Sequence, residues 1–213
     1  MIFITGETTG KKMIELLIKY GWGRMFINKT PTPYPGEKWG FDNGAFICWQ
    51  NDKPFDEVKY MKRLETAYKI TEPYLAVVPD IVGEGKRSLD YSMEWIEKLP
   101  PWPWYLAVQD GMTLNQVADI IHRFEGLFLG GTNAFKGTAY HWCKLAHEHG
   151  KKFHYGRAGT PRKIDHAMAV GADSADSAFP LWTYDRMGEL VSHINGPKQA
   201  SIWSEEITAS IIT

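Results

Sequence analysis

The chain has 213 residues, 44% of them hydrophobic and 23% charged, so it is long enough to fold as one domain with a sizeable core. Its formal net charge of −1 excludes an overall basic composition, so a nucleic-acid partner would need a local basic patch. The two cysteines, Cys48 and Cys143, are far apart and have no CxxC or Cys/His ligand spacing, which argues against a structural zinc site.

Short apolar runs alternate along the chain with longer amphipathic stretches, in which apolar residues recur at helical spacing. The runs predict strands at Met1–Thr5, Arg24–Asn28, Trp39–Asp42, Tyr74–Asp80, Trp104–Gln109, Leu127–Gly130, Lys152–Tyr155 and Ala172–Ser177. The amphipathic stretches predict helices at Lys11–Tyr20, Phe55–Ile70, Gly85–Leu99, Leu114–Phe124 (with Thr113 as N-cap), Gly137–His149 and Pro161–Val170, followed by a mixed helical tail.

Strands that alternate with helices indicate βαβ units and a parallel sheet. Eight such units predict a compact (β/α)8 TIM barrel, a single domain over residues 1–213. The second unit is abbreviated, because a proline-rich loop containing Pro31, Pro33 and Pro35 stands where its helix would be. A doubly wound open sheet is the alternative, but no GxGxxG follows the first strand, which weakens a dinucleotide-binding interpretation.

The N-terminus predicts no targeting segment. Met1 begins directly on an apolar run that is too short to span a bilayer and has no basic region before it. Two isolated thiols fit a reducing compartment, so we expect a soluble, cytoplasmic protein with no membrane partner.

Polar residues follow the predicted strands, where the active site of such a barrel is built. A single Asp there is most simply a helix N-cap or a turn former, but four carboxylates that end separate strands favour a shared site. Gly130-Gly131 lets backbone approach a ligand closely, although a tight turn explains it equally well. The strand-end segments are Asp42-Asn43-Gly44, Asp80, Gln109-Asp110-Gly111, Gly130–Asn133, Tyr155–Gly159 and Asp173–Asp176.

Five of these segments, in order over about residues 39–180, resemble motifs of the tRNA-guanine transglycosylase superfamily. Phe41–Phe46 is similar to its Asp-Ser-Gly-Gly-Phe element, and Val78-Pro79-Asp80 matches the position of its base-recognising aspartate. Val108–Gly111 is similar to the family's Val-Gln-Gly-Gly segment, and Leu129–Gly131 to its Gly-Gly-Leu-Ala-Val-Gly loop. The last match has two parts: His154–Pro161 resembles Gly-Val-Gly-Thr-Pro, and Ala169–Ser177 resembles the Gly-x-Asp-x-Phe-Asp that follows it.

The resemblance implies an enzyme that exchanges guanine for a 7-deazaguanine base through a covalent sugar–enzyme intermediate, without a cofactor. It implies Asp176 as nucleophile and Asp42 as general acid/base, roles that suit carboxyl groups. The base would be held by Asp80, Gln109, Asn43, Phe46 and the backbone of Gly130 and Gly131.

This chain also departs from the family pattern. The Cys/His zinc site and basic tail of the tRNA enzymes are not found in it, and Ala175 stands where the family has phenylalanine before the nucleophile. The chain thus resembles more the compact relatives that insert 7-deazaguanine bases, such as a preQ0-like base, into DNA. DNA is the expected polymer, and tRNA is the alternative.

Basic residues gather in or just after the strand-end loops, although helix N-termini ordinarily favour acidic residues. Solvated helix starts explain each one, but together they suggest a phosphate backbone crossing the barrel mouth. Aromatic rings at Trp39, Phe41, Phe46 and Trp49 are equally suited to stacking on an extruded base and to the core. The basic residues are Lys86, Arg87, Lys136, Arg157, Arg162 and Lys163.

Two other classes of function remain as alternatives. A non-catalytic barrel subunit that binds nucleic acid or a partner would have lost the catalytic aspartates, whereas Asp42 and Asp176 are both present. An unrelated hydrolase or metal enzyme would use Asp42, Asp80 and His154, but no ligand spacing supports it. Spacing alone does not choose between Asp173 and Asp176 as nucleophile; the family register selects Asp176.

Overall fold

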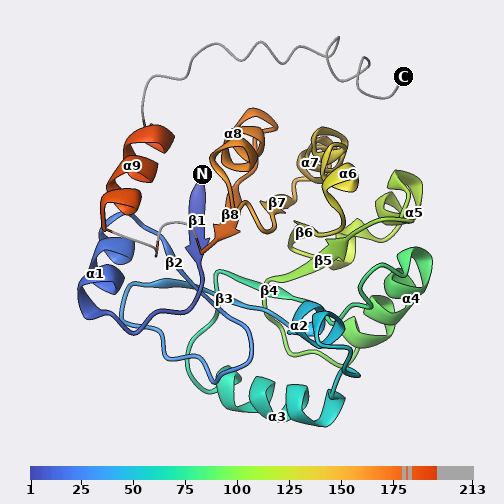
Figure 1. Cartoon of the computed structure of the whole chain (residues 1–213). Coiled ribbons are helices and arrows are strands. Elements are labelled where there is room, and N and C mark those ends of the chain that lie inside the picture. The colour runs from blue at the N-terminus through green and yellow to red at the C-terminus, as the bar shows by residue number, and fades with distance from the viewer. Residues whose placement is uncertain (179–180, 182–183, 196–213) are drawn as a thin grey trace.

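Eight parallel strands close into a barrel in the computed structural model, which describes residues 1–178, 181 and 184–195 (Figure 1). The predicted (β/α)8 architecture is therefore confirmed. Each strand pairs with its neighbours in the sequence, and β8 pairs with β1. The strands are β1 (Ile2–Thr5), β2 (Gly23–Phe26), β3 (Lys38–Phe41), β4 (Leu75–Val77), β5 (Trp104–Val108), β6 (Gly126–Leu129), β7 (Lys152–Tyr155) and β8 (Ser174–Ser177).

Helices surround the ring of strands, and no helix is found between β2 and β3, as the proline-rich loop predicts (Figure 1). No helix within the described ranges is both long and apolar enough to cross a membrane. The helices are α1 (Lys11–Lys19), α2 (Ala45–Gln50), α3 (Glu57–Tyr68), α4 (Gly85–Ile96), α5 (Leu114–Ala118), the 3-10 turn η1 (Ile121–Arg123), α6 (Asn133–Lys136), α7 (Ala139–Glu148), α8 (Pro161–Ala169) and α9 (Tyr184–Asn195).

The helices differ from the prediction in two places that matter. The stretch predicted as one helix, Leu114–Phe124, begins with a capping box at Thr113 but stops at Ala118, and a 3-10 turn then carries Phe124 into the core. The short helix α2 was not predicted, because six residues are too few to show a periodicity. Of the predicted helical tail, α9 is seen, and residues 196–213 lie outside the described part of the chain.

Two apolar layers meet at the strands. One fills the barrel interior, and the other packs the outer side of the strands against the helices. Because side chains alternate along a strand, the interior positions continue two residues further on into the polar strand ends. Tyr105 and Ala107, for instance, lead to Gln109. The interior layer consists of Ile4, Met25, Leu75, Val77, Tyr105 and Ala107.

A buried ion pair joins two of the loops that flank the mouth of the barrel. The Arg24 guanidinium binds both carboxylate oxygens of Glu37 at 2.6 and 2.8 Å, and the two side chains are 4% and 0% exposed. Its other N–H groups donate to the carbonyls of Thr8 and Thr32, and Glu37 accepts from the backbone of Tyr34. The pair therefore fixes the β1–α1 and β2–β3 loops to each other.

Breaking this pair should be costly. Glu37→Gln leaves the buried guanidinium without its counter-charge, so we expect the free energy of unfolding to fall by about 3–5 kcal/mol in urea titrations. Glu15→Gln is the matched control, since it breaks the exposed pair with Lys11 and should change stability by no more than about 0.5 kcal/mol. If the two substitutions lower the free energy of unfolding equally, the buried pair stabilises the fold no more than an exposed pair does.

Candidate active site

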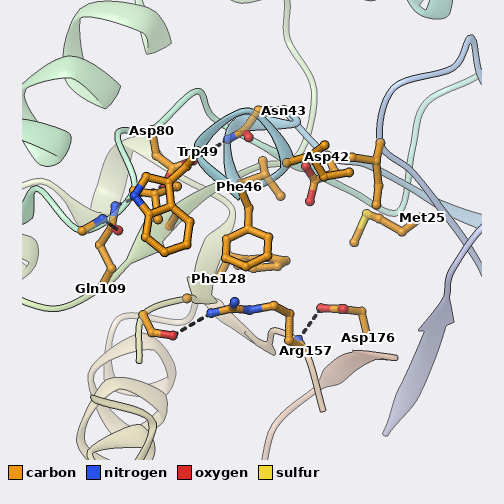
Figure 2. Close-up of a pocket in the computed structure, with 18 of the residues that line it drawn as sticks. Met25, Asp42, Asn43, Phe46, Trp49, Asp80, Gln109, Phe128, Arg157 and Asp176 are labelled. Carbon is orange, nitrogen blue, oxygen red and sulfur yellow. Dashed lines mark hydrogen bonds between the residues drawn. The ribbon is translucent and has the colours of Figure 1, made fainter. Parts of the chain in front are cut away.

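A cavity of about 460 Å³ opens at the carboxyl ends of the strands. The four residues expected to converge there all line it: Asp42 after β3, Asp80 after β4, Gln109 after β5 and Asp176 in β8. In Figure 2 the carboxyl groups of Asp42 and Asp176 lie on the same side of the cavity. Most of the remaining lining is apolar, from residues such as Met25, Ile27, Phe46, Trp49, Val77 and Phe128.

Asp80 is held by two side-chain amides. The Asn43 Nδ2 donates to Asp80 Oδ1 at 2.7 Å, and the Gln109 Nε2 donates to Asp80 Oδ2 at 3.1 Å. Burial raises the pKa of Asp80 to about 6, even though both amides act to lower it. The amides also bind backbone, Asn43 at Val78 and Gln109 at Gly83. Asn43 and Gln109 line the cavity, and through these bonds their polar atoms fix Asp80 in place. Their expected contact with the base stays a prediction.

Asp42 sits at the start of α2 in a different environment. Its Oδ1 accepts from the backbone N–H of Gly44 at 2.6 Å, and its carbonyl accepts from Arg63 of α3. Burial raises the pKa of Asp42; the Gly44 N–H opposes this, and the charge of Asp176 adds to it. A carboxyl group that keeps its proton closer to neutral pH suits a general acid. Arg63 could not be predicted as part of the site, because it lies within the helix α3 and belongs to no strand-end motif.

Asp176 is bound through one of its two oxygens. Its Oδ1 accepts from His154 Nε2 and from the backbone N–H of Arg157, both at 3.0 Å. The Asp176 side chain is 20% exposed, whereas His154 is fully buried. His154 was considered only for an unrelated hydrolase, yet it is the side-chain partner of Asp176. The signal in the sequence is its place in the predicted strand Lys152–Tyr155, just before a polar strand end. The register then places it on the interior side, because it pairs with Ser174, two residues before Asp176 on β8.

Aromatic rings and Arg157 form one wall of the cavity (Figure 2). The Arg157 guanidinium lies 4.2 Å from the centre of the Phe46 ring and donates to the Gly131 carbonyl at 2.6 Å. Phe46 stacks on Trp49, whose side chain is 59% exposed. Trp39 and Phe41, the other stacking candidates, are buried core residues.

Gly130 and Gly131 both line the cavity, and a tight turn requires at least the second of them. Gly131 has a φ of +71°, and a Cβ there would lie 2.6 Å from Asp110 Oδ2. Asp110 in turn accepts from the N–H and hydroxyl of Thr132. The turn interpretation and the ligand-approach interpretation are therefore compatible.

Four of the six expected phosphate-binding cations already contact protein groups, Arg157 through the Gly131 carbonyl described above. Lys136 is buried, and its ammonium donates to the carbonyls of Leu129 and Gly156, which corrects its assignment to the basic patch that binds phosphate. Burial, reinforced by the nearby Arg157, lowers its pKa to about 7. Lys86 pairs with Asp90 at 2.6 Å and Arg87 with Glu84 at 3.5 Å. Arg157 lines the cavity, and the other two cations, Arg162 and Lys163, lie in the first turn of α8, which follows β7.

Asp173 lies just before β8, at the other end of the barrel from Asp176. It accepts from the Phe153 N–H at 2.7 Å and from His147 Nε2 at 3.0 Å, and it is not among the residues that line the cavity, which favours Asp176 over Asp173 as the residue of the site. The neighbouring Cys143 is buried, which raises its thiol pKa to about 12. Within the described residues, no three His, Cys, Asp or Glu side chains are grouped so as to hold a metal ion.

Comparisons with known proteins add the fold and nothing more specific. No protein-family model matches the sequence, and no curated protein matches it. The chain is similar in structure to N-acetylneuraminate lyase of Proteus mirabilis, with a TM-score of 0.58 and 12% sequence identity over 91% of this chain and 75% of that one. A likeness at this identity shows the TIM barrel alone.

Asp80 should give stability a distinct pH dependence. Its pKa rises from 3.8 to about 6 on folding, so its protonated form stabilises the fold, and that contribution is lost as the pH rises through about 6. Between about pH 4 and pH 7 we expect the free energy of unfolding to fall by up to about 3 kcal/mol more in the wild type than in Asp80→Asn. Urea titrations across this range measure the difference. Parallel curves would contradict a buried, ionisable Asp80.

Proposed function

We propose that the protein is a transglycosylase that replaces guanine in a nucleic acid with a 7-deazaguanine base, through a covalent bond between Asp176 and the sugar. The observation that carries the proposal is the pair of carboxyl groups, Asp42 and Asp176, on one side of a cavity with aromatic walls. The volume of about 460 Å³ lies within the range of about 300–1,000 Å³ that is usual for small-molecule sites.

The two carboxyl groups divide the reaction between them. The free oxygen of Asp176 forms a bond to the sugar carbon as the bond to guanine breaks and its electron pair leaves with the base. Asp42 supplies a proton to the departing base. In the second half, the incoming base gives a proton to Asp42, attacks the same carbon and releases the Asp176 carboxylate.

The environment of Asp80 supports recognition of a guanine-like edge. When ionised, Asp80 is an acceptor, and guanine presents N–H donors along one edge. Asn43 and Gln109 fix its orientation, and a buried acceptor left without a donor is penalised, so a base lacking these donors is rejected. Phe46, Trp49 and Phe128 offer rings for stacking on the base.

The polymer that we propose is DNA, with tRNA as the second candidate. The resemblance to compact DNA-modifying relatives favours DNA, and the cations near the cavity mouth, Arg157, Arg162 and Lys163, suit a phosphate backbone in either case. Incubating the protein with each polymer and labelled 7-deazaguanine tests the choice, since only the substrate takes up label.

Replacing each of the two proposed catalytic aspartates should affect base exchange and adduct formation differently. Asp176→Asn removes the anion that attacks the sugar, so we expect no exchange and no covalent protein–nucleic acid adduct. Asp42→Asn keeps the nucleophile, so exchange should slow strongly while some adduct still forms. Adducts are measured on denaturing gels and exchange by uptake of labelled base.

Asp173→Asn is the matched control for this pair, because Asp173 lies at the opposite end of the barrel. It should exchange base at the wild-type rate. If Asp176→Asn also exchanges at that rate, the nucleophile lies elsewhere and the assignment of the site fails.

The salt dependence of nucleic-acid binding tests whether Arg162 and Lys163 bind phosphate groups. Arg162→Ala and Lys163→Ala should each weaken nucleic-acid binding evenly across sequences and lower the slope of log affinity against log salt by about one. Lys86→Ala is the control, since Lys86 already pairs with Asp90. Fluorescence anisotropy at several salt concentrations measures the slopes, and equal slopes for all three variants would rule out the assigned patch.

A further inference from the structure

His154 lies completely buried inside the barrel, and both of its ring nitrogens have partners. Nε2 is 3.0 Å from Asp176 Oδ1, and Nδ1 is 2.8 Å from Ser174 Oγ. The ring stacks on Phe128, with centroids 4.6 Å apart and planes 20° from parallel. Two hydrogen bonds and a stacked ring leave this imidazole one orientation.

The chemistry of the partners sets the direction of these hydrogen bonds. An ionised carboxylate only accepts, so His154 Nε2 must carry the hydrogen that it shares with Asp176. In a neutral imidazole Nδ1 then accepts, and the Ser174 hydroxyl must donate to it. The two partners, Ser174 and Asp176, thus fix which nitrogen of His154 carries the hydrogen.

The result is an asymmetric carboxylate. Oδ1 of Asp176 has two donors, the His154 ring and the backbone N–H of Arg157, and no donor to Oδ2 is found among the described residues. Rotation of the carboxylate would break both bonds to Oδ1. One oxygen is therefore anchored to the protein, and the other is available to the cavity that Asp176 lines.

We propose that His154 is a positioning residue for Asp176: it anchors Oδ1 so that Oδ2 is presented to the reacting carbon. This inference rests on the proposed function, because it assigns Oδ2 as the attacking atom. It goes beyond that function by adding a second side chain on which the nucleophile depends, supported by Ser174. Any buried imidazole needs an acceptor for its N–H, but here that acceptor is the one carboxylate of β8 that lines the cavity.

Two substitutions separate positioning from packing. His154→Gln can place an amide N–H near the position of Nε2, whereas His154→Phe keeps a flat ring against Phe128 but has no donor. For the Phe variant we expect kcat for base exchange to fall roughly 100-fold with KM little changed, as for a misplaced reacting group. The Gln variant should recover most of this loss in kcat. The kcat of Ser174→Ala should lie between those of the Gln variant and the wild type.

Thermal melting of each variant shows whether it is folded. If folded His154→Phe keeps a kcat within about threefold of the wild type, or if the Gln variant is as impaired as the Phe variant, His154 does not position Asp176.

A second measurement does not depend on activity. Nitrogen-15 NMR of the wild-type imidazole should show a protonated Nε2 with a slowly exchanging hydrogen and an unprotonated Nδ1. In Asp176→Ala that hydrogen should exchange rapidly, because its acceptor is gone. Absence of base exchange in the wild type would count against the proposed function, whereas the wrong tautomer, or no effect of Asp176→Ala, would overturn the inference about His154.

Discussion

Pairing between the first and last strands is the constraint on which the site depends. Four residue pairs, from Ile2↔Ser174 to Thr5↔Ser177, close the barrel, and paired residues share a side of the sheet. Ile4 belongs to the interior layer, so its partner Asp176 points inward as well. A slip of one residue would turn Asp176 towards the helices and bring Ala175 into the cavity, which would leave the site without its proposed nucleophile.

Gathering carboxyl groups in a closed barrel has an energetic cost that the surrounding donors only partly offset. Burial raises the pKa values of both Asp42 and Asp80, which means that their charged forms destabilise the fold. Asn43 and Gln109 stabilise ionised Asp80, and the Gly44 N–H does the same for Asp42. This arrangement is typical of sites in which function, rather than stability, determines the residues.

Much of the fold could be predicted from local patterns, because a buried strand or an amphipathic helix is visible within about ten residues. All eight strands were predicted to within a few residues, and the proline-rich loop predicted that no helix stands between β2 and β3. The short helix α2 and the break after Ala118 could not be predicted in this way. Both depend on how a short segment packs against the rest of the barrel, which its own sequence does not record.

The sequence alone determined that polar residues end the strands, and hence that Asp42, Asp80, Gln109 and Asp176 meet at one end of a barrel. Only the tertiary structure decided what each of them binds. Asp80 meets Asn43 from 37 residues away, and Asp176 meets His154 from 22 residues away. Burial likewise decided that Lys136 bridges two strands instead of facing solvent. The physical reason is that local patterns fix which side of a strand a residue faces, whereas hydrogen-bond partners and desolvation are fixed by distant segments that pack around it.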